Sequence, residues 1–431
     1  MGWLMRPEKI SGVPFVRRFC DSERMRGMTD TLTIGERVAW YRRRRGMTQE
    51  VLAGLVARTV DWLGKIENNR IAIDRLSVIR ALADALDVSV GDLIAEPTLL
   101  EWADDSGRVT VPALRAALMD YRQITRVLIP APSQGQPDLE RLRGQVIGVW
   151  DAYQHSRYGF VTNRLPQLLS DVRTAEQYSE GGDQRRARDL LAMTYQAAAT
   201  ILTKLGESDL AWMAADRGLA AAQDSGSPVI VGSLFRSVAH SLLSNGRYAE
   251  SVRLTNDAAD FLLPGLATAS PEYLSVYGTL FLAGAMGAAR NEDRGTTEEF
   301  LREAHQTAVR LGRDGNHFWT AFGPTNVAIH RVSTAMELGD VQVAIDLGPR
   351  VNAAALPMER RVRHAIELAR AYSAWNRRDE ALSVLLDAEQ LAPEQVRHHY
   401  ISRQLVLGWI RQQRRKPKQQ LADLASRLRV A

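Results

Sequence analysis

The sequence predicts an all-α protein of two to three domains, and three observations support this prediction. Apolar residues recur at spacings of three and four along nearly the whole chain, which is the period of an amphipathic helix. Alanine is plentiful, and signals for β-strands are almost absent. The length of 431 residues exceeds that of one ordinary domain.

Composition and charge exclude several classes of protein. Hydrophobic residues make up 45% of the chain and charged residues 24%, and no apolar run reaches the length of about 18 residues that a membrane span needs. Cys20 is the one cysteine, so the chain has no internal disulfide and no cysteine zinc cluster. A net charge of +5 is compatible with nucleic acid. We expect a cytoplasmic protein with no membrane contact, no metal and no cofactor.

The N-terminal segment, residues 1–31, has no clean period and no apolar core of a signal peptide. It contains further methionines at Met5, Met25 and Met28. We expect a disordered tail, with ordered structure beginning near Thr31 and the native start at Met25 or Met28.

Three segments follow this tail. Residues 32–96 have the pattern of five short helices. Residues 97–137 are predicted to be a linker with one helix, because stretches with loop composition flank a single apolar helical segment. Residues 138–431 are predicted to be a longer series of helices.

The segment at residues 32–96 begins with two helices. In the first, "IGERVAWYRRRR", Ile34, Val38 and Tyr41 share one face, and Gly46 ends the helix as a C-terminal glycine. Thr48 is a good N-cap for the second, "QEVLAGLVA". We expect the second helix to bury three apolar residues: Leu52, Leu55 and Val56.

The third helix lies in the stretch "ARTVDWLGKIENN", residues 57–69. Thr59 is a natural N-cap, and Leu63 and Ile66, three residues apart, form the buried pair. Trp62 lies on the flank, and the opposite face carries Asp61, Gly64 and Lys65. Two more helices follow, with predicted N-caps at Asp74 and Ser89.

At these residues the chain resembles the Cro/cI-type (XRE) helix-turn-helix family. The stretch "MTQEVLAGLVARTVDWLGKIENNR" carries the pattern, and the match covers residues 34–94, ending in "ALDVSVGDLI". The resemblance implies that Gln49 contacts the DNA backbone and that the third helix lies in the major groove. It implies a structural pair between Arg42 and Glu67. It implies base-edge contacts from Thr59, Val60, Asp61 and Lys65. Trp62, which we expect to be a packing or backbone-facing residue more than a base reader, and Asn68 complete the predicted DNA-binding residues of the third helix.

Several charged residues have two possible roles. Arg43, Arg44 and Arg45 either touch phosphates or form an ordinary solvated face. Asp61 either accepts a hydrogen bond from a cytosine amino group or complements the positive helix start, and we favour the second role. Lys65 is the best candidate for a guanine or phosphate contact. Binding dominated by phosphates would weaken steeply with salt.

The chain departs from the family pattern at two positions that usually hold glycine. They are Ala57, after the second helix, and Asn69, after the third, and asparagine tolerates a left-handed backbone. Gly64, inside the third helix, costs about 1 kcal/mol of helix stability relative to alanine. It either lets the backbone approach DNA closely or is simply tolerated.

Residues 138–431 contain a repeat similar to the tetratricopeptide pattern. In the clearest copy, "LARAYSAWNRRDEALSVLLDAEQLAP", small residues fall where the helices cross: Ala369, Ala381 and Ala388. Further copies are predicted near residues 198–218, 238–264, 273–312 and 331–348. Such repeats stack into a superhelix with a concave face, and an irregular helical bundle is the alternative. We therefore predict a helix-turn-helix domain followed by a tetratricopeptide-like α-solenoid.

This layout resembles the peptide-responsive RRNPP regulators and a large set of actinobacterial regulators, and the alanine- and arginine-rich character of the chain is most similar to the actinobacterial set. The resemblance implies a cytoplasmic, homodimeric transcription regulator that binds double-stranded DNA at paired half-sites. Its repeats would take a peptide, small-molecule or protein effector. The candidate effector residues are Arg236, His240, Trp319, Asn326 and His330. The histidine and asparagine side chains of repeat helices are mostly solvated or satisfied internally, and we favour that interpretation over ligand binding.

No enzyme is predicted. The sequence has no phosphate-binding glycine loop, no His-Glu-x-x-His and no Gly-x-Ser-x-Gly, and His398 and His399 point to different faces of a helix. Two other functions stay open: an interaction scaffold with a vestigial DNA-binding head, and an antitoxin-like repressor with a protein partner. The operator, the effector and the sign of regulation do not follow from the sequence.

Overall fold

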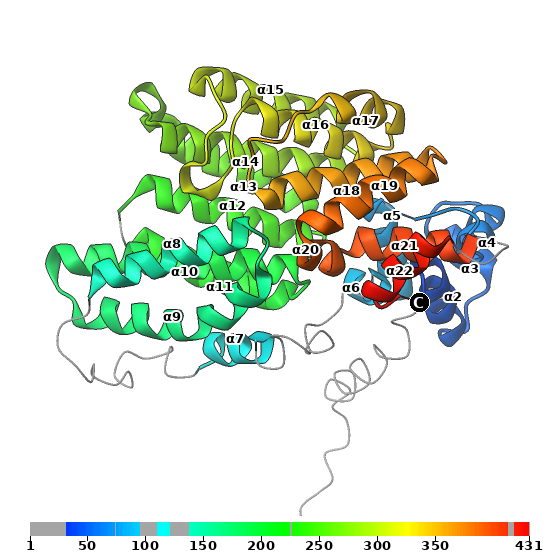
Figure 1. The fold of residues 1–431 in the computed structure, drawn as a ribbon, viewed down its shortest axis with the longest axis horizontal. Helices are drawn as coiled ribbons and strands as arrows, with labels where there is room; N and C mark the ends of the chain where they lie inside the picture. Colours follow the sequence, from blue (N-terminus) through cyan, green and yellow to red (C-terminus); the bar gives the residue numbers. More distant parts are fainter. Residues whose placement is uncertain are drawn as a thin grey trace, which may run out of the picture.

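A computed structural model describes residues 32–73, 75–94, 110–120, 138–224, 226–412 and 418–430 of the chain. Within these ranges every regular element is a helix, so the predicted all-α fold is confirmed. The helices form a small N-terminal head, residues 32–94, and a larger body, residues 110–430, which we call the ring (Figure 1). None of the described helices has both the length and the apolar character of a membrane span. The predicted tail lies outside the described residues.

The head contains the five predicted helices. They are α2 (Ile34–Arg44), α3 (Gln49–Leu55), α4 (Val60–Glu67), α5 (Leu76–Leu86) and α6 (Val90–Ile94). The first three begin at threonine caps, each of which accepts a hydrogen bond from the backbone N–H three residues on: Thr33, Thr48 and Thr59. Each hydroxyl satisfies a donor that the helix leaves free, so local chemistry fixes where these helices begin.

One core prediction for the head is wrong. Leu55 was expected to be buried with Leu52, but its exposed fraction is 60%, and Val56 is only half-buried. Leu55 is the last residue of the seven-residue α3, whose buried side is supplied by Leu52 and Ala53. Because the helix ends there and the chain turns toward α4, the core of the head does not reach Leu55. The predicted cap at Asp74 lies outside the described residues.

Gly35 lets α2 and α4 approach each other closely. A side-chain carbon at this position would lie 2.1 Å from the carbonyl oxygen of Ile66, far closer than any real contact. This requirement is set by a helix distant in sequence. The pattern of α2 alone therefore does not identify the glycine as essential.

The ring is built mainly from paired helices. They are α7 (Thr110–Leu118), α8 (Leu139–Gln154), α9 (Tyr158–Tyr178), α10 (Gly181–Lys204), α11 (Ser208–Gln223), α12 (Pro228–Ser244), α13 (Tyr248–Leu262), α14 (Pro271–Arg290), α15 (Arg294–Leu311), α16 (Pro324–Leu338), α17 (Val341–Leu347), α18 (Met358–Ala374), α19 (Arg378–Leu391), α20 (Pro393–His398), α21 (Tyr400–Gln412) and α22 (Gln419–Arg427). The predicted repeats coincide with successive pairs from α10–α11 to α18–α19. Ala369 and Ala381 are fully buried where α18 packs on α19, as small residues at a close crossing should be.

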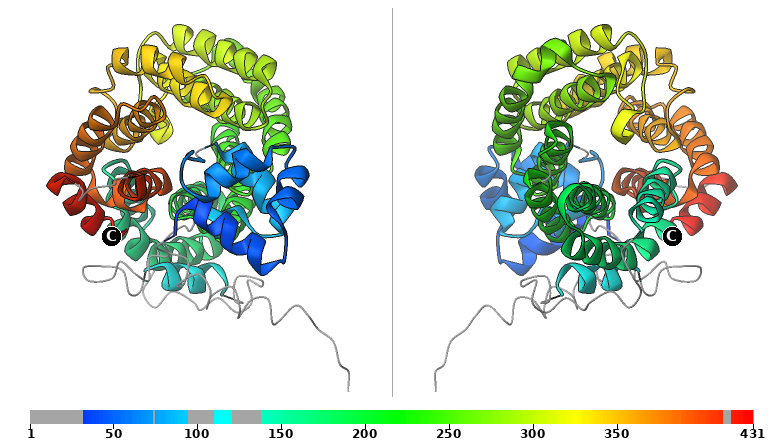
Figure 2. Two further views of the ribbon diagram at one scale, coloured as in Figure 1. Left: turned by 90° about the vertical axis from the view of Figure 1, so that its right-hand side faces the viewer. Right: turned by 90° about the vertical axis from the view of Figure 1, so that its left-hand side faces the viewer.

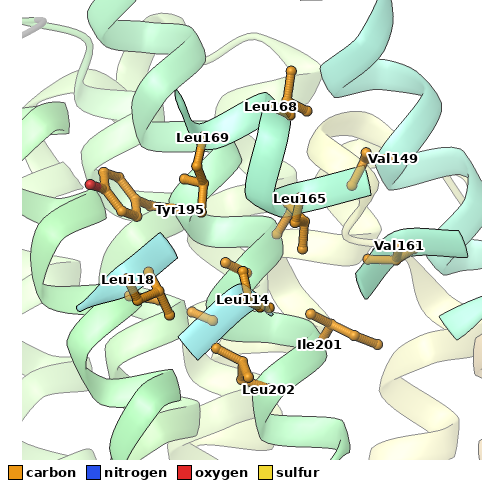
Figure 3. Close-up of a cluster of buried hydrophobic side chains, with 14 of the residues drawn as sticks. Leu114, Leu118, Val149, Val161, Leu165, Leu168, Leu169, Tyr195, Ile201 and Leu202 are labelled. Atoms are coloured by element: carbon orange, nitrogen blue, oxygen red, sulfur yellow. The ribbon is translucent and has the colours of Figure 1, made fainter. Parts of the chain in front are cut away.

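The helix in the predicted linker belongs to the core of the ring. Leu114 and Leu118 of α7 are fully buried in one apolar cluster with Leu165 of α9 and Ile201 of α10 (Figure 3). Burying a leucine side chain stabilises by roughly 1.5–3 kcal/mol. The two leucines therefore fasten α7 firmly to the ring.

The helices return on themselves, so the superhelix closes into a ring (Figure 2). The hydroxyl of Ser156, in the turn before α9, donates to the amide oxygen of Gln395 at 2.7 Å. Lys204 of α10 forms an ion pair with Glu359 of α18 at 2.5 Å. The concave face predicted for the repeats is therefore the inside of a ring.

The head lies across one end of the ring and contacts two parts of it (Figure 2). On one side Arg75 donates to the carbonyl oxygen of Glu337 and to the carboxylate of Glu292, each at 3.0 Å. Three ring residues share the apolar core of the head: Leu243, Tyr248 and Met286. This part of the contact is therefore both apolar and charged.

The second contact joins the head to α21. The backbone N–H of Ile34 donates to the amide oxygen of Gln404 at 3.1 Å, and the amide of Gln412 donates to the carbonyl oxygen of Asn69 at 3.0 Å. The head is thus held from both sides of the ring opening.

Candidate functional site

The free face of α4 is the candidate DNA-contacting surface. Leu63 and Ile66 are buried, as the sequence predicts, and hold the opposite face of the helix in the core. Thr59, Val60 and Asp61 are exposed at the start of α4. The docked ring therefore leaves this end of the helix open to solvent.

Lys65 continues this surface one turn further on. Its side chain is 43% exposed, and its ammonium group lies 2.6 Å from the carboxylate of Asp61. Asn68, at the end of α4, is exposed and donates to the carbonyl oxygen of Gly64 at 2.7 Å. Asp61 therefore balances a lysine of its own helix, besides lying near the positive helix start.

Trp62 lies on the flank of α4, between the head and the ring. The guanidinium of Arg58 lies 5.6 Å from the Trp62 ring centroid, a cation–π distance. Both residues line a pocket of about 360 Å³, to which the ring contributes Tyr248 and Arg290. The side chain of Trp62 therefore faces the junction with the ring.

A buried network joins α2, α3 and α4 behind this surface. Arg42 makes two parallel hydrogen bonds to Glu67, at 2.6 and 2.8 Å, and a third to the carbonyl oxygen of Met47 at 2.8 Å. The amide nitrogen of Gln49 donates to Glu67 at 2.8 Å. Burial alone would raise the pKa of Glu67, but the hydrogen bonds from Arg42 and Gln49 outweigh it and lower that pKa. Arg42 and Glu67 therefore form a structural pair, and the side-chain nitrogen of Gln49 points toward this pair.

The neighbouring arginines differ in their surroundings. Arg43 and Arg44 are exposed, and Arg44 lies over the ring of Trp40 at 5.3 Å. Arg45 donates to the backbone oxygen of Asp87 at 2.7 Å and to its carboxylate at 3.1 Å, which ties it to the end of α5.

The two positions that depart from the family pattern both have left-handed backbones. The φ angle is 52° at Ala57 and 57° at Asn69. Asn69 accepts from the hydroxyl of Thr33 at 2.6 Å and donates to Glu36 at 3.1 Å, so its side chain anchors the loop. Ala57 has no polar side chain with which to do the same. A carbon added at Gly64 would lie 3.9 Å from its nearest neighbour, so this position has room for a side chain.

Three candidate effector residues come together inside the ring. Arg236 and His240 lie on α12 and His330 on α16, and all three are half-buried and interact electrostatically with one another. Helices from several sides of the ring contribute to one group of charges, so these side chains face its interior. The inner basic cluster, as we call this group, comprises Lys204, Arg236, His240, His330, Arg360 and Arg363.

Most cations of the inner basic cluster have carboxylate partners, but Arg236 has none among the described residues. Glu359 pairs with Lys204 at 2.5 Å and lies 3.8 Å from Arg360, and Glu367 pairs with Arg363 at 3.0 Å. Within the described part of the chain, Arg236 makes neither an ion pair nor a hydrogen bond.

The pKa values reflect this excess of positive charge. Burial, together with the charge on Arg360, lowers the pKa of Arg236 to about 10. Burial and the nearby arginines lower the pKa of His330 to about 3, and that of His240 lies well below its ordinary value. Both histidines are therefore neutral at pH 7. The pKa of Glu359 falls to about 2 because Lys204 and Arg360 outweigh its burial.

The other two candidate effector residues lie elsewhere. Asn326 is buried, and its amide reaches toward the carbonyl oxygen of Thr320 at 3.4 Å. Trp319 stacks on Trp150 with a centroid distance of 5.3 Å and lines a separate pocket of about 590 Å³ together with Phe318. Neither belongs to the inner basic cluster.

The sequence interpretation missed Lys204, Arg360, Arg363 and Glu359. They lie on α10 and α18, far from Arg236 in sequence, and meet it only because the ring closes. No local motif marks them, because each is an ordinary charged residue of an amphipathic helix.

Comparisons with known proteins agree on the head. Residues 33–96 match the helix-turn-helix domain family, so the head is a helix-turn-helix domain. No curated protein matches the chain.

Several solved structures are similar to the chain. One is Bacillus thuringiensis PlcR in complex with the peptide PapR7 and DNA, with 14% identity, coverage of 83% of this chain and 98% of that one, and a TM-score of 0.36. Another is a Rap protein complexed with competence and sporulation factor, with 11% identity, 85% and 99% coverage, and a TM-score of 0.45. A third is BtubC (BKLC) from P. vanneervenii, with 15% identity, 64% and 95% coverage, and a TM-score of 0.33.

Proposed function

We propose that the chain is a cytoplasmic, homodimeric transcription regulator that binds DNA through α4 and an effector through the inside of its ring. The observation that supports this most is that α4, in a helix-turn-helix domain, keeps its N-terminal face exposed while the ring holds the head. A second helix of such a motif is placed to enter the major groove. No catalytic role is assigned to any residue.

In this proposal different residues of the head contact the bases and the phosphates. Lys65, Thr59 and Val60 meet base edges, and Asn68 lies at the far end of the same surface. Gln49, Arg43 and Arg44 contact phosphates. To do so, the amide of Gln49 has to give up its hydrogen bond to Glu67. Trp62 serves the junction with the ring more than the groove, because the pocket it lines is shared with ring residues.

The test is a footprint on the DNA upstream of the chain's own gene at low salt. We expect protection of two half-sites and an affinity that falls steeply as salt rises. Lys65→Ala should weaken binding about tenfold, which is the loss typical of one good contact. The matched control is Lys418→Ala, which removes an exposed lysine of the ring and should leave affinity unchanged. Absence of protection, with Lys65→Ala equal to the unaltered chain, would favour an interaction scaffold.

The role of Asp61 can be separated from that of Lys65. If Asp61 only balances Lys65 and the helix start, Asp61→Asn should raise affinity for all sequences, because a negative charge near phosphates is lost. If Asp61 accepts from a cytosine, the same variant should lose affinity for the operator alone. We expect the first result.

Dimerisation needs its own measurement. Light scattering after size exclusion should give twice the chain mass of 48.0 kDa. A monomer that still protects a single half-site would retain the DNA-binding proposal but remove the dimer from it.

A further inference from the structure

We propose that the inner basic cluster binds a compact anionic group, a carboxylate or a phosphate, of the effector. This inference rests on the proposal that the ring holds the effector and adds the chemical class that it must present. Arg236 is the residue on which the inference depends most.

The first argument is the cost of a half-buried charge that has no ion-pair partner. A charged group removed from water without a partner costs several kcal/mol of stability, so proteins pair such groups or use them for binding. The ring follows this rule elsewhere. Arg370 is fully buried and pairs with Glu337 at 3.3 Å and with Glu367 at 3.2 Å. Arg236 faces the same interior and lacks a carboxylate in the described part of the chain.

The second argument is that the cluster keeps free hydrogen-bond donors. The Nε of Arg360 is buried and lies 3.8 Å from Glu359, and it has no hydrogen-bond partner among the described residues. Guanidinium groups bind planar oxygen pairs in a fork, which suits carboxylate and phosphate better than a neutral ligand. A bound anion would accept from the guanidinium groups of Arg236 and Arg360, whose charges act on each other.

The third argument concerns the histidines. His240 and His330 stay neutral in this surrounding, so they add hydrogen-bonding nitrogens without further charge. The Nδ1 of His330 already donates to the carbonyl oxygen of Asn326 at 2.9 Å, so its Nε2 is an acceptor, and the donor nitrogen of His240 is the one that can face an oxygen of the ligand. The cluster therefore combines charge for attraction with neutral groups for orientation.

The tryptophan-lined pocket does not provide an equivalent argument. It has mixed polar and apolar walls, and its histidine, His317, already pairs with Glu272 at 3.0 Å. Nothing there selects one ligand chemistry, whereas the inner basic cluster selects an anion.

The test uses the full chain without DNA and four probes: inorganic phosphate, inorganic pyrophosphate, and a hexa-alanine peptide with a free C-terminal carboxylate or with a C-terminal amide. Binding is measured by calorimetry and by thermal melting against sodium chloride of equal ionic strength. We expect either the phosphates or the free-carboxylate peptide to bind, which identifies the source of the anion, and the amide to bind more weakly than the free acid. If no probe binds or raises the melting temperature more than sodium chloride of equal ionic strength does, the inference is overturned.

Arg236→Gln should weaken binding of the active probe about tenfold or more, the loss typical of a hydrogen bond to a charged group. Arg302→Gln, an exposed arginine of α15, is the matched control and should bind as the unaltered chain does. Equal binding by the two variants would overturn the inference. If Arg236→Gln does not fold, Arg236→Lys serves instead, since it keeps the charge but loses the fork and should weaken binding by a smaller factor.

The two proposals fail separately. A footprint that persists when no anion binds would overturn only the anionic class. Anion binding that depends on Arg236, without any footprint, would keep the anion site and remove the DNA-binding regulator.

Discussion

Arg42 in the head and Arg236 inside the ring differ in whether their guanidinium groups have acceptors. In the head, three nitrogens of Arg42 donate to oxygen acceptors, two of which belong to Glu67. In the ring, Arg236 has no such acceptor in the described part of the chain. The first arrangement suits an element that must keep one shape, because a satisfied network fixes geometry. The second leaves the hydrogen-bond donors of Arg236 without acceptors, as expected of a residue that binds a ligand.

The same contrast extends to titratable groups. None of the eight histidines of the chain lies in the head, whereas several lie in the ring with lowered pKa values. The head is therefore expected to be insensitive to pH near neutrality and the ring sensitive. This difference can be tested independently of any ligand.

The largest effect is expected from breaking the pair in the head. Glu67→Gln leaves Arg42 charged and nearly buried without its carboxylate, so the head should lose about 3 kcal/mol or more of its free energy of unfolding. Hydrogen exchange of the amides in α2 and α4 measures the loss locally. The matched control is Glu50→Gln, an exposed first-turn glutamate of α3, which should change exchange little. Equal protection in both variants would mean that the pair contributes nothing to the fold of the head.

The next effect is the acid sensitivity of the ring. His240, His330 and His399 have folded-state pKa values below the unfolded value of 6.5, so only the unfolded chain gains their protons as the pH falls below 6.5. Stability should therefore drop between pH 7 and pH 5, by about 1–2 kcal/mol per histidine. Glu67, whose pKa is lowered, should keep the head stable until the pH falls below its unfolded value of 4.5.

Hydrogen exchange at pH 7 and pH 5, corrected for intrinsic exchange rates, should therefore show that the amides of α12 and α16 lose protection at a higher pH than those of α2 and α4. His330→Gln should remove part of this loss, and His305→Gln, an exposed histidine of α15, should not. A loss of protection that begins in the head would contradict the expected difference in pH sensitivity between head and ring.

The sequence predicted the head better than the ring interior for a physical reason. The helices of the head are set by threonine caps and by the spacing of Leu63 and Ile66, all of which are local features. Arg42 and Glu67 were found from the family resemblance. Leu55 was misplaced because helical spacing does not reveal where a short helix ends. The need for glycine at Gly35 was not predicted, because the backbone that it contacts belongs to another helix.

For the ring, the repeat pattern predicts the helix pairs but does not predict closure. Arg236, His240 and His330 were chosen as polar residues on repeat helices. Their grouping with Lys204 and Arg360 depends on the contact between α10 and α18. A site assembled from residues far apart in sequence has no local signal, and its charge balance can be counted only after the ring is closed.

A smaller effect, of opposite sign to the first, is expected at Arg236. Arg236→Met removes a half-buried charge without leaving a partner unsatisfied, so stability should stay equal or rise by about 1 kcal/mol. Arg370→Met is the control, since it removes from buried Glu337 and Glu367 a cation that both contact and should destabilise the ring. Thermal melting of both variants decides the matter. A loss at Arg236 similar to that at Arg370 would show that Arg236 has a structural role.

The smallest effect tests how the two regions make their turns. In both regions some left-handed turns hold glycine, with φ of 65° at Gly46 of the head and 77° at Gly206 of the ring, and others hold a residue with a side chain, with φ of 52° at Ala57 of the head and 61° at Asn376 of the ring. Ala57→Gly removes the clash of the alanine side chain but increases the freedom of the unfolded chain, and the balance should favour the variant by roughly 0.4–1 kcal/mol. Asn69→Gly relieves the same backbone but loses the hydrogen bonds to Thr33 and Glu36, so it should give no gain. Exchange in α3 and α4 distinguishes the two variants. Because Ala57 precedes Thr59 at the start of α4, a stabilised turn that also slows DNA association would indicate that the head uses this strained alanine to stay adjustable.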